Sequence, residues 1–147
     1  MHTLPTGQAL ASLRVLDLSR VRAGPTCVRM LADFGADVIR VEPPPGIDAN
    51  DNMFVDNREG GDFQNLNRNK RSLTLNLKKP EGLAVFRELV KTADVVVENW
   101  RPDVKHRLGL DYEALDDLFN RQSGLLGICG SVALMSPDNR WLDSAKV

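Results

Sequence analysis

The chain has 147 residues, of which 42% are hydrophobic and 27% are charged, and its formal net charge is -1. This size and composition are typical of one folded domain, and the near-neutral charge gives no reason to expect nucleic acid or an anionic membrane as a partner. The N-terminus lacks a basic segment followed by an apolar one, and no apolar run is long enough to span a bilayer. We therefore expect a cytoplasmic protein.

Residues 13–43 form the first expected structural unit. Apolar runs at 14–18 and 37–41 are typical of short strands, and a helical pattern lies between them. A crossover of this length places the two strands in parallel with a right-handed connection. Ligands on such sheets bind beyond the carboxyl ends of the strands, so the turn at 19–25 is the expected ligand position.

The helix in this unit is expected to bury one apolar face. Four residues recur at helical spacing: Cys27, Met30, Leu31 and Phe34. They are predicted to face the sheet, which makes Cys27 a buried thiol rather than a nucleophile or a disulfide partner of the distant Cys129. Gly35 stands where a glycine often ends a helix.

The rest of the chain is predicted to be a long loop at 46–71 followed by more strands and helices. Expected strands lie at 72–77, 93–97 and 125–129. Expected helices begin at Pro80 and Pro102 and after a capping Asp111. This order predicts an α/β fold, an open and mostly parallel Rossmann-like sheet with helices on both faces. The predicted domain spans residues 13–130, between a tail at 1–12 and a divergent or truncated tail at 131–147.

The turn after the first strand is a poor match for a nicotinamide dinucleotide site. The usual fingerprint needs three glycines, and this turn has only Gly24. Glu42 ends the second strand, where such enzymes place a ribose-binding acid, although a solvated glutamate at a strand end is the favoured explanation. A nicotinamide-dependent oxidoreductase is therefore the less favoured alternative.

Five basic residues lie between positions 68 and 79 without an acidic one: Arg68, Lys70, Arg71, Lys78 and Lys79. They form either a solvated edge or a phosphate-binding surface. The turn at 99–101 also has two interpretations, because Asn99 and Trp100 either cap and pack, or contact an anion beside the next helix. His106 is expected on the surface, and no pattern predicts a metal site.

Three stretches in the same order resemble the family III CoA-transferases, the group that includes formyl-CoA transferase, carnitine CoA-transferase and α-methylacyl-CoA racemase. They read VLDLSRVRAGPTCVRMLADFGADVIRVEPP, LNRNKRSLTLNLKKPEG and ADVVVENWRPDVKHRLGLDYEAL, and they cover roughly residues 13–118. The resemblance implies the CoA-binding, incomplete N-terminal half of a larger subunit. It also implies CoA thioesters and carboxylic acids as substrates, no prosthetic group, and an interlocked homodimer in intact relatives.

The resemblance further implies a set of CoA-binding residues: Val21, Arg40, Lys78, Asn99, Trp100 and Arg107. Val21 and Arg40 correspond to positions around the adenine. Lys78 and Arg107 correspond to residues that meet the nucleotide or its phosphates, and Asn99 and Trp100 to a turn near the diphosphate and pantetheine arm.

The resemblance ends after Cys129. Family members are commonly well over twice this length, and their catalytic aspartate follows later, so neither Asp138 nor Asp143 takes that role and no catalytic residue is assigned. We expect a truncated or frame-disrupted chain that binds CoA with little or no catalysis and exposes apolar surface. An intact relative transfers CoA between carboxylic acids or epimerises an acyl-CoA. The alternative is a non-catalytic CoA-binding or interaction module.

Overall fold

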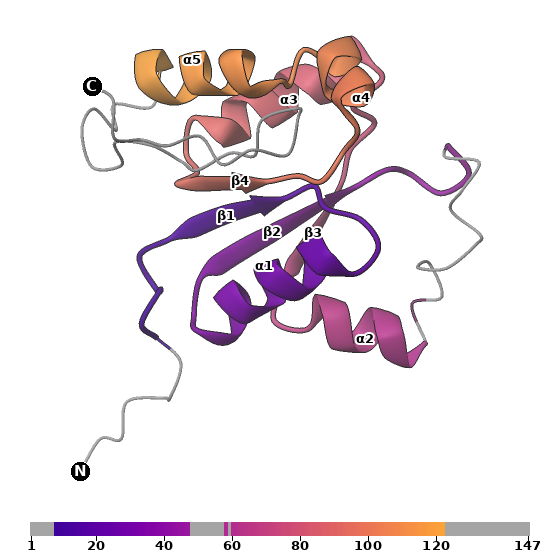
Figure 1. Ribbon diagram of the computed structural model, residues 1–147, viewed down its shortest axis with the longest axis vertical. Helices are drawn as coiled ribbons and strands as arrows, with labels where there is room; N and C mark the ends of the chain where they lie inside the picture. The colour runs from indigo at the N-terminus through magenta and orange to yellow at the C-terminus, as the bar shows by residue number, and fades with distance from the viewer. Residues whose placement is uncertain (1–7, 48–57, 59, 123–147) are drawn as a thin grey trace. The chain divides into compact units, whose positions relative to one another are not determined.

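A computed structural model describes residues 8–47, 58 and 60–122, which belong to two compact units, residues 1–101 and 102–147. The first unit is built on a parallel sheet of four strands in the order β3-β2-β1-β4 (Figure 1). The strands are β1 (Arg14–Asp17), β2 (Asp37–Glu42), β3 (Arg71–Thr74) and β4 (Val95–Val97). In the register, Asp17 lies opposite Arg40 on one side and Val97 on the other.

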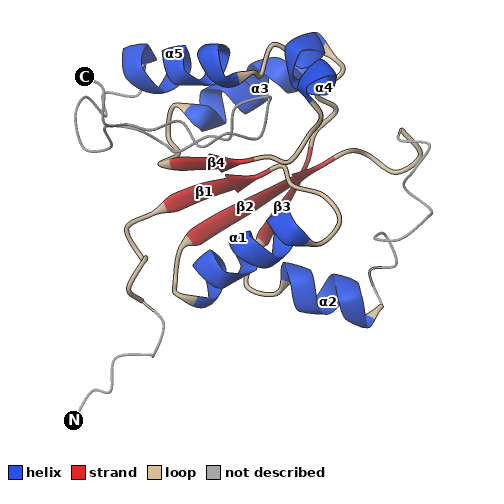
Figure 2. Cartoon of the chain, viewed as in Figure 1, coloured by secondary structure: helices blue, strands red, loops and turns tan. Residues whose placement is uncertain are grey.

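Helices cover both faces of this sheet. Helices α1 (Ala23–Asp33) and α2 (Gly61–Asn67) lie on one face, and α3 (Pro80–Val90) lies on the other (Figure 2). The chain runs outward from β1 to β3 and then crosses back to β4. Because connections between parallel strands are right-handed, the helix before β4 lies on the opposite face of the sheet from the helices before β2 and β3. The predicted fold class, an open parallel α/β sheet with helices on both faces, is confirmed.

The core lies where β1 and β2 meet α1. The cluster contains five buried residues: Val15, Val28, Ala32, Ala36 and Val38. Both β1 and β2 have a strand on each side, and Val15 and Leu16 of β1 are fully buried. An apolar run without alternation is what a strand covered on both faces requires.

The prediction for the face of α1 was wrong for three of its four residues, because only Leu31 packs against the core. Pro25, Val28 and Ala32 are buried, whereas Cys27 is exposed and the side chains of Met30 and Phe34 are 51% and 53% exposed. Both sets of residues have helical spacing, so periodicity did not distinguish them. Packing against the sheet selects the set with smaller and β-branched side chains. Gly35 ends the helix as predicted, with a φ of 100°.

The prediction of a loop across 46–71 was also wrong at its end, because α2 occupies residues 61–67. A connection between parallel strands has to cover the sheet, and α2 does so with the buried Leu66. Three strands, β1, β3 and β4, are shorter than predicted, whereas β2 extends one residue further, to Glu42. β3 stops at Thr74, where the chain turns toward α3, and β4 begins at Val95.

The second unit contains α4 (Pro102–Leu108) and α5 (Tyr112–Gln122). Both were predicted, and the Oδ1 atom of Asp111 accepts a hydrogen bond from the N–H of Ala114 at 3.0 Å, as a cap should. The strand predicted at 125–129 and most of both predicted tails lie outside the described residues. No helix within the described ranges is long and apolar enough to cross a membrane.

Candidate functional site

The strand order places a candidate site at the carboxyl edge of β1 and β4. In open α/β sheets, ligands bind outside the carboxyl ends of the strands at the point where the order reverses, which here lies between these two strands. Two segments leave the sheet at this point, residues 19–25 after β1 and residues 98–101 after β4. We call them the β1 turn and the β4 turn.

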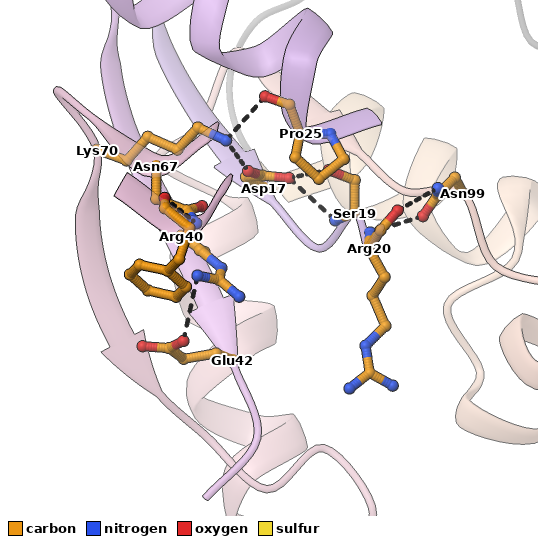
Figure 3. Close-up of polar contacts among 10 residues, drawn as sticks. Asp17, Ser19, Arg20, Pro25, Arg40, Glu42, Asn67, Lys70 and Asn99 are labelled. Atoms are coloured by element: carbon orange, nitrogen blue, oxygen red, sulfur yellow. Dashed lines mark hydrogen bonds and ion pairs between the residues drawn. The ribbon is translucent and has the colours of Figure 1, made fainter. Parts of the chain in front are cut away.

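Asn99 joins the two turns. Its side-chain oxygen accepts a hydrogen bond from the N–H of Arg20 at 2.8 Å, and its amide nitrogen donates one to the carbonyl oxygen of Arg20, also at 2.8 Å (Figure 3). The amide thereby pairs with the backbone as a neighbouring strand would. It continues the pairing of β1 with β4, in which the N–H of Leu18 donates to the carbonyl of Val97 at 2.8 Å.

The β1 turn is strained at its tip. Val21 has a φ of 68°, which is a rare conformation for a β-branched residue, and its side chain is 55% exposed. Such strain persists only where the surrounding structure holds it, and it clusters at ligand-binding positions. Gly24 contributes to the tight turn, because a Cβ atom there would lie 2.4 Å from the Cβ of Ser19.

A buried polar network lies beneath the β1 turn. The N–H of Ser19 donates to Oδ1 of Asp17 at 2.9 Å, and the Ser19 hydroxyl donates to the same oxygen. The Nζ of Lys70 lies 2.8 Å from Oδ2 of Asp17 and 3.1 Å from the carbonyl oxygen of Pro25 (Figure 3). Burial lowers the pKa of Lys70, and its contact with the Asp17 carboxylate opposes this shift.

Sequence reasoning missed this network. The sequence pattern identifies Lys70 only as a member of the basic cluster and Asp17 only as part of a strand. The one available signal was a carboxylate at the end of an apolar strand, because a buried charge of this kind requires a partner. Its partner is 53 positions away in the sequence.

Arg40 lies one strand away from Asp17, beneath an aromatic ring. Its guanidinium is 5.0 Å from the centre of the Phe63 ring, and Arg58 is 5.2 Å from the same ring. The Nη1 atom of Arg40 lies 3.5 Å from Oε2 of Glu42 (Figure 3). This atom is buried and has no hydrogen-bond partner among the residues that the structure describes.

Both carboxylate oxygens of Glu42 contact side chains within the protein. Its Oε1 atom accepts hydrogen bonds from the Ser72 hydroxyl and from Arg58, and Oε2 faces Arg40. Burial raises the pKa of Glu42, but these hydrogen bonds outweigh burial and hold the pKa below its ordinary value. A carboxylate held in this way is a structural anion and is poorly suited to receive a ribose hydroxyl.

Lys78 lies in the turn between β3 and α3, on the same carboxyl edge. Its N–H is held by the side chain of Asn76 at 3.1 Å, and the N–H of Lys79 donates to the Asn76 carbonyl at 3.0 Å. Gly82 permits this arrangement, because a Cβ atom there would lie 2.3 Å from the Asn76 carbonyl oxygen. The Lys78 side chain is exposed.

The structure therefore brings four of the six predicted residues to one edge of the sheet: Val21, Arg40, Lys78 and Asn99. Trp100 follows Asn99 directly, and its N–H donates to Oε2 of Glu98 at 2.7 Å. Arg107 lies on α4, in the second unit. Within the described ranges, no three His, Cys, Asp or Glu side chains are grouped as metal ligands.

Curated relatives match the same part of the chain. The succinate–glutarate CoA-transferase of Agrobacterium fabrum is 48% identical over 114 residues, which are 72% of this chain and 28% of the relative. The formyl-CoA:oxalate CoA-transferase of Rhodopseudomonas palustris is 45% identical over 113 residues, covering 76% of this chain and 27% of the relative. The chain thus spans less than a third of the length of these relatives.

Solved structures agree with this match. A CAIB/BAIF family protein from Brucella suis is 37% identical, with a TM-score of 0.64 over 76% of this chain and 31% of that one. A hypothetical protein from Mycobacterium tuberculosis is 35% identical, with a TM-score of 0.62 over 75% of this chain and 30% of that one. Residues 10–121 match the profile of CoA-transferase family III. Sequence, fold and profile together show that this chain belongs to CoA-transferase family III.

Proposed function

We propose that this chain binds the nucleotide part of CoA or of an acyl-CoA at the carboxyl edge of its sheet. The observation that carries the proposal is the pairing of Asn99 with both backbone groups of Arg20, beside the strained Val21. This pairing prepares a rigid, exposed turn where α/β sheets bind ligands. A rigid turn lowers the entropy cost of binding.

The chemistry of the edge suits an anionic nucleotide. Val21 offers an exposed apolar contact for the flat face of an adenine, and Arg40 supplies a guanidinium held by Phe63 and Glu42. Lys78 adds a mobile positive charge for phosphate, next to a turn fixed by Asn76. Trp100 is proposed to contact the pantetheine arm. The assignment of Arg107, in the second unit, to the CoA phosphates stays a prediction from the sequence.

The names of the relatives indicate the reaction class. Both are CoA-transferases that act between carboxylic acids, so we propose CoA transfer rather than epimerisation of an acyl-CoA for the whole protein. CoA is then a substrate and not a prosthetic group, and the second substrate is a carboxylic acid. A homodimer in the cytoplasm is part of the same proposal.

A nicotinamide dinucleotide is the competing ligand, and the contacts of Glu42 argue against it. This acid is buried and paired with Arg58, Ser72 and Arg40, so its oxygens are already occupied. The only glycine of the β1 turn is explained by its contact with Ser19. Neither residue performs the role that such a site requires.

Isothermal titration of the 147-residue chain with CoA tests the proposal, with NAD⁺ as the competing ligand. We expect saturable binding of CoA and a Kd for NAD⁺ that is at least about tenfold weaker. Lys78→Ala should weaken CoA binding, whereas the control Lys91→Ala should not, because Lys91 follows the other end of α3. Absence of CoA binding, or equal binding of NAD⁺, would overturn the proposal.

A further inference from the structure

The polar network beneath the β1 turn contains a charged pair that the proposed CoA contacts do not use. The side chains of Asp17 and Lys70 are each 1% exposed, so neither reaches a ligand at the surface. A buried ion pair often adds little to stability, because desolvation of both charges opposes their attraction. The presence of the pair at this place is better explained by what it holds in position.

The contacts of Lys70 connect the two ends of the β1 turn. Its Nζ binds Oδ2 of Asp17, the last residue of β1, and the carbonyl oxygen of Pro25, in the first turn of α1. The strained Val21 lies between these two anchor points. The other oxygen of Asp17 holds Ser19, which in turn contacts Gly24. One ammonium group therefore fixes the span across which the turn must bend.

We propose that Lys70, through Asp17 and Pro25, is a positioning residue that keeps the β1 turn in its CoA-binding conformation. Asn99 holds the exposed side of the turn and Lys70 holds its buried side. The inference rests on the proposed CoA binding for its effect on affinity. The effect of Lys70 on the conformation of the β1 turn is independent of any ligand.

Loss of the Lys70 contacts should lower the fraction of molecules in which the β1 turn has the conformation that binds CoA. If only about a tenth of the molecules keep the bound conformation, the apparent Kd rises about tenfold. The variant Lys70→Met keeps the unbranched shape of the side chain, one atom shorter, but removes its charge and donors. It leaves Asp17 buried without its cation, which could prevent folding. The double variant Asp17→Asn/Lys70→Met removes both charges and replaces the single variant in the experiment if the single variant does not fold.

Two measurements on the full chain test the proposal: the Kd for CoA by titration calorimetry, and the hydrogen exchange rate of the Arg20 amide by NMR. The Arg20 amide is informative because its acceptor is Asn99, which none of the substitutions changes. The control is Asp94→Ala, which removes the 2.7 Å hydrogen bond to the N–H of Arg14 at the opposite edge of the sheet.

We expect both Lys70 variants to raise the Kd for CoA about tenfold and to speed exchange of the Arg20 amide, at a temperature where circular dichroism shows full folding. Asp94→Ala should lower the Tm and change neither readout. Unchanged exchange in the double variant, or an affinity loss no greater than in Asp94→Ala, would overturn the proposal. If the unmodified chain fails to bind CoA, the proposed function fails, while the exchange rate still decides whether Lys70 positions the turn.

Discussion

Asn99 shows how much of the candidate site depends on single side chains. Its sequence context allows two interpretations, a helix cap or a ligand contact. The structure shows a third role, which is to join the β4 turn to the β1 turn. Its oxygen and its nitrogen both pair with the backbone of Arg20. A side-chain amide suits this task because it carries an acceptor and a donor side by side, as a peptide group does. We infer that Asn99 supports binding mainly by shaping the β1 turn.

Replacement of Asn99 by Ala should test this role. Two hydrogen bonds are lost at an exposed position, so we expect the free energy of unfolding to fall by about 1–2 kcal/mol and CoA affinity to fall with it. Urea titration and calorimetry measure the two effects. Thr92→Ala is the control, because its hydroxyl bonds Leu89 at the far end of α3. Equal effects of the two substitutions on CoA affinity would contradict the assignment.

At the scale of elements, α1 buries a different face from the one that its hydrophobic pattern predicts. The helix turns Val28 and Ala32 toward the sheet and leaves Cys27, Met30 and Phe34 outside. Hydrophobicity alone would have buried the larger side chains, but volume decides at a contact with β1 and β2. The exposed residues form an apolar strip on the outer face of α1.

The exposed position of Cys27 on α1 predicts that its thiol is reactive in the folded protein. In a Cys129→Ser variant, the thiol of Cys27 should be modified by a disulfide reagent in the native state as completely as in urea. Exposure rather than unfolding then controls the reaction. Modification that requires denaturant would show that the thiol is buried, as the sequence pattern first indicated. Absorbance of the released thiolate measures the extent.

Helix α3 begins in a contact that tolerates no extra atom. The Asn76 carbonyl oxygen would lie 2.3 Å from a Cβ atom at Gly82, and this oxygen belongs to the backbone, so it cannot rotate away as a flexible side chain would. We expect Gly82→Ala to destabilise the chain by about 1–3 kcal/mol, although alanine is the better helix former. Thermal unfolding followed by circular dichroism measures the loss. A raised Tm would show that helix propensity outweighs the contact.

At the scale of the whole molecule, the first unit has carboxylates whose pKa values lie below their ordinary range. A hydrogen bond from Arg68 lowers the pKa of Asp33. Burial raises the pKa of Asp37, but hydrogen bonds from Arg14 and Arg71 outweigh it. The pKa of Glu42 is lowered in the same way. These groups therefore favour the folded state most when they are ionised.

Stability should consequently fall in acid. The unfolded carboxyls titrate near pH 4, and the folded ones titrate below that, so the contribution is complete above about pH 5 and is lost as the pH falls through the folded pKa values. We expect the urea midpoint to drop between about pH 6 and about pH 3. Arg71→Met should make the drop smaller by removing one of the two arginines that bond Asp37. A midpoint that stays constant over this range would contradict the assignment.

The sequence by itself determined the family, the parallel α/β fold and most of the elements. Apolar runs and helix boundary residues such as Pro80, Gly35 and Asp111 act locally, so they can be identified along the chain. The bounds of the predicted domain at 13 and 130 stay a prediction. The sequence also indicated a ligand at the turn after β1, and the strand order supports that position.

The tertiary structure alone decided which side chains hold the turn. Asn99 and Arg20 are 79 positions apart, and Lys70 and Asp17 are 53 apart. Their contacts arise only when β1 lies beside β4 and the segment before β3 passes beneath α1. The face of α1 and the helix α2 were likewise set by packing against the sheet. Local patterns in the sequence report propensity and spacing, whereas these features depend on contacts between distant segments.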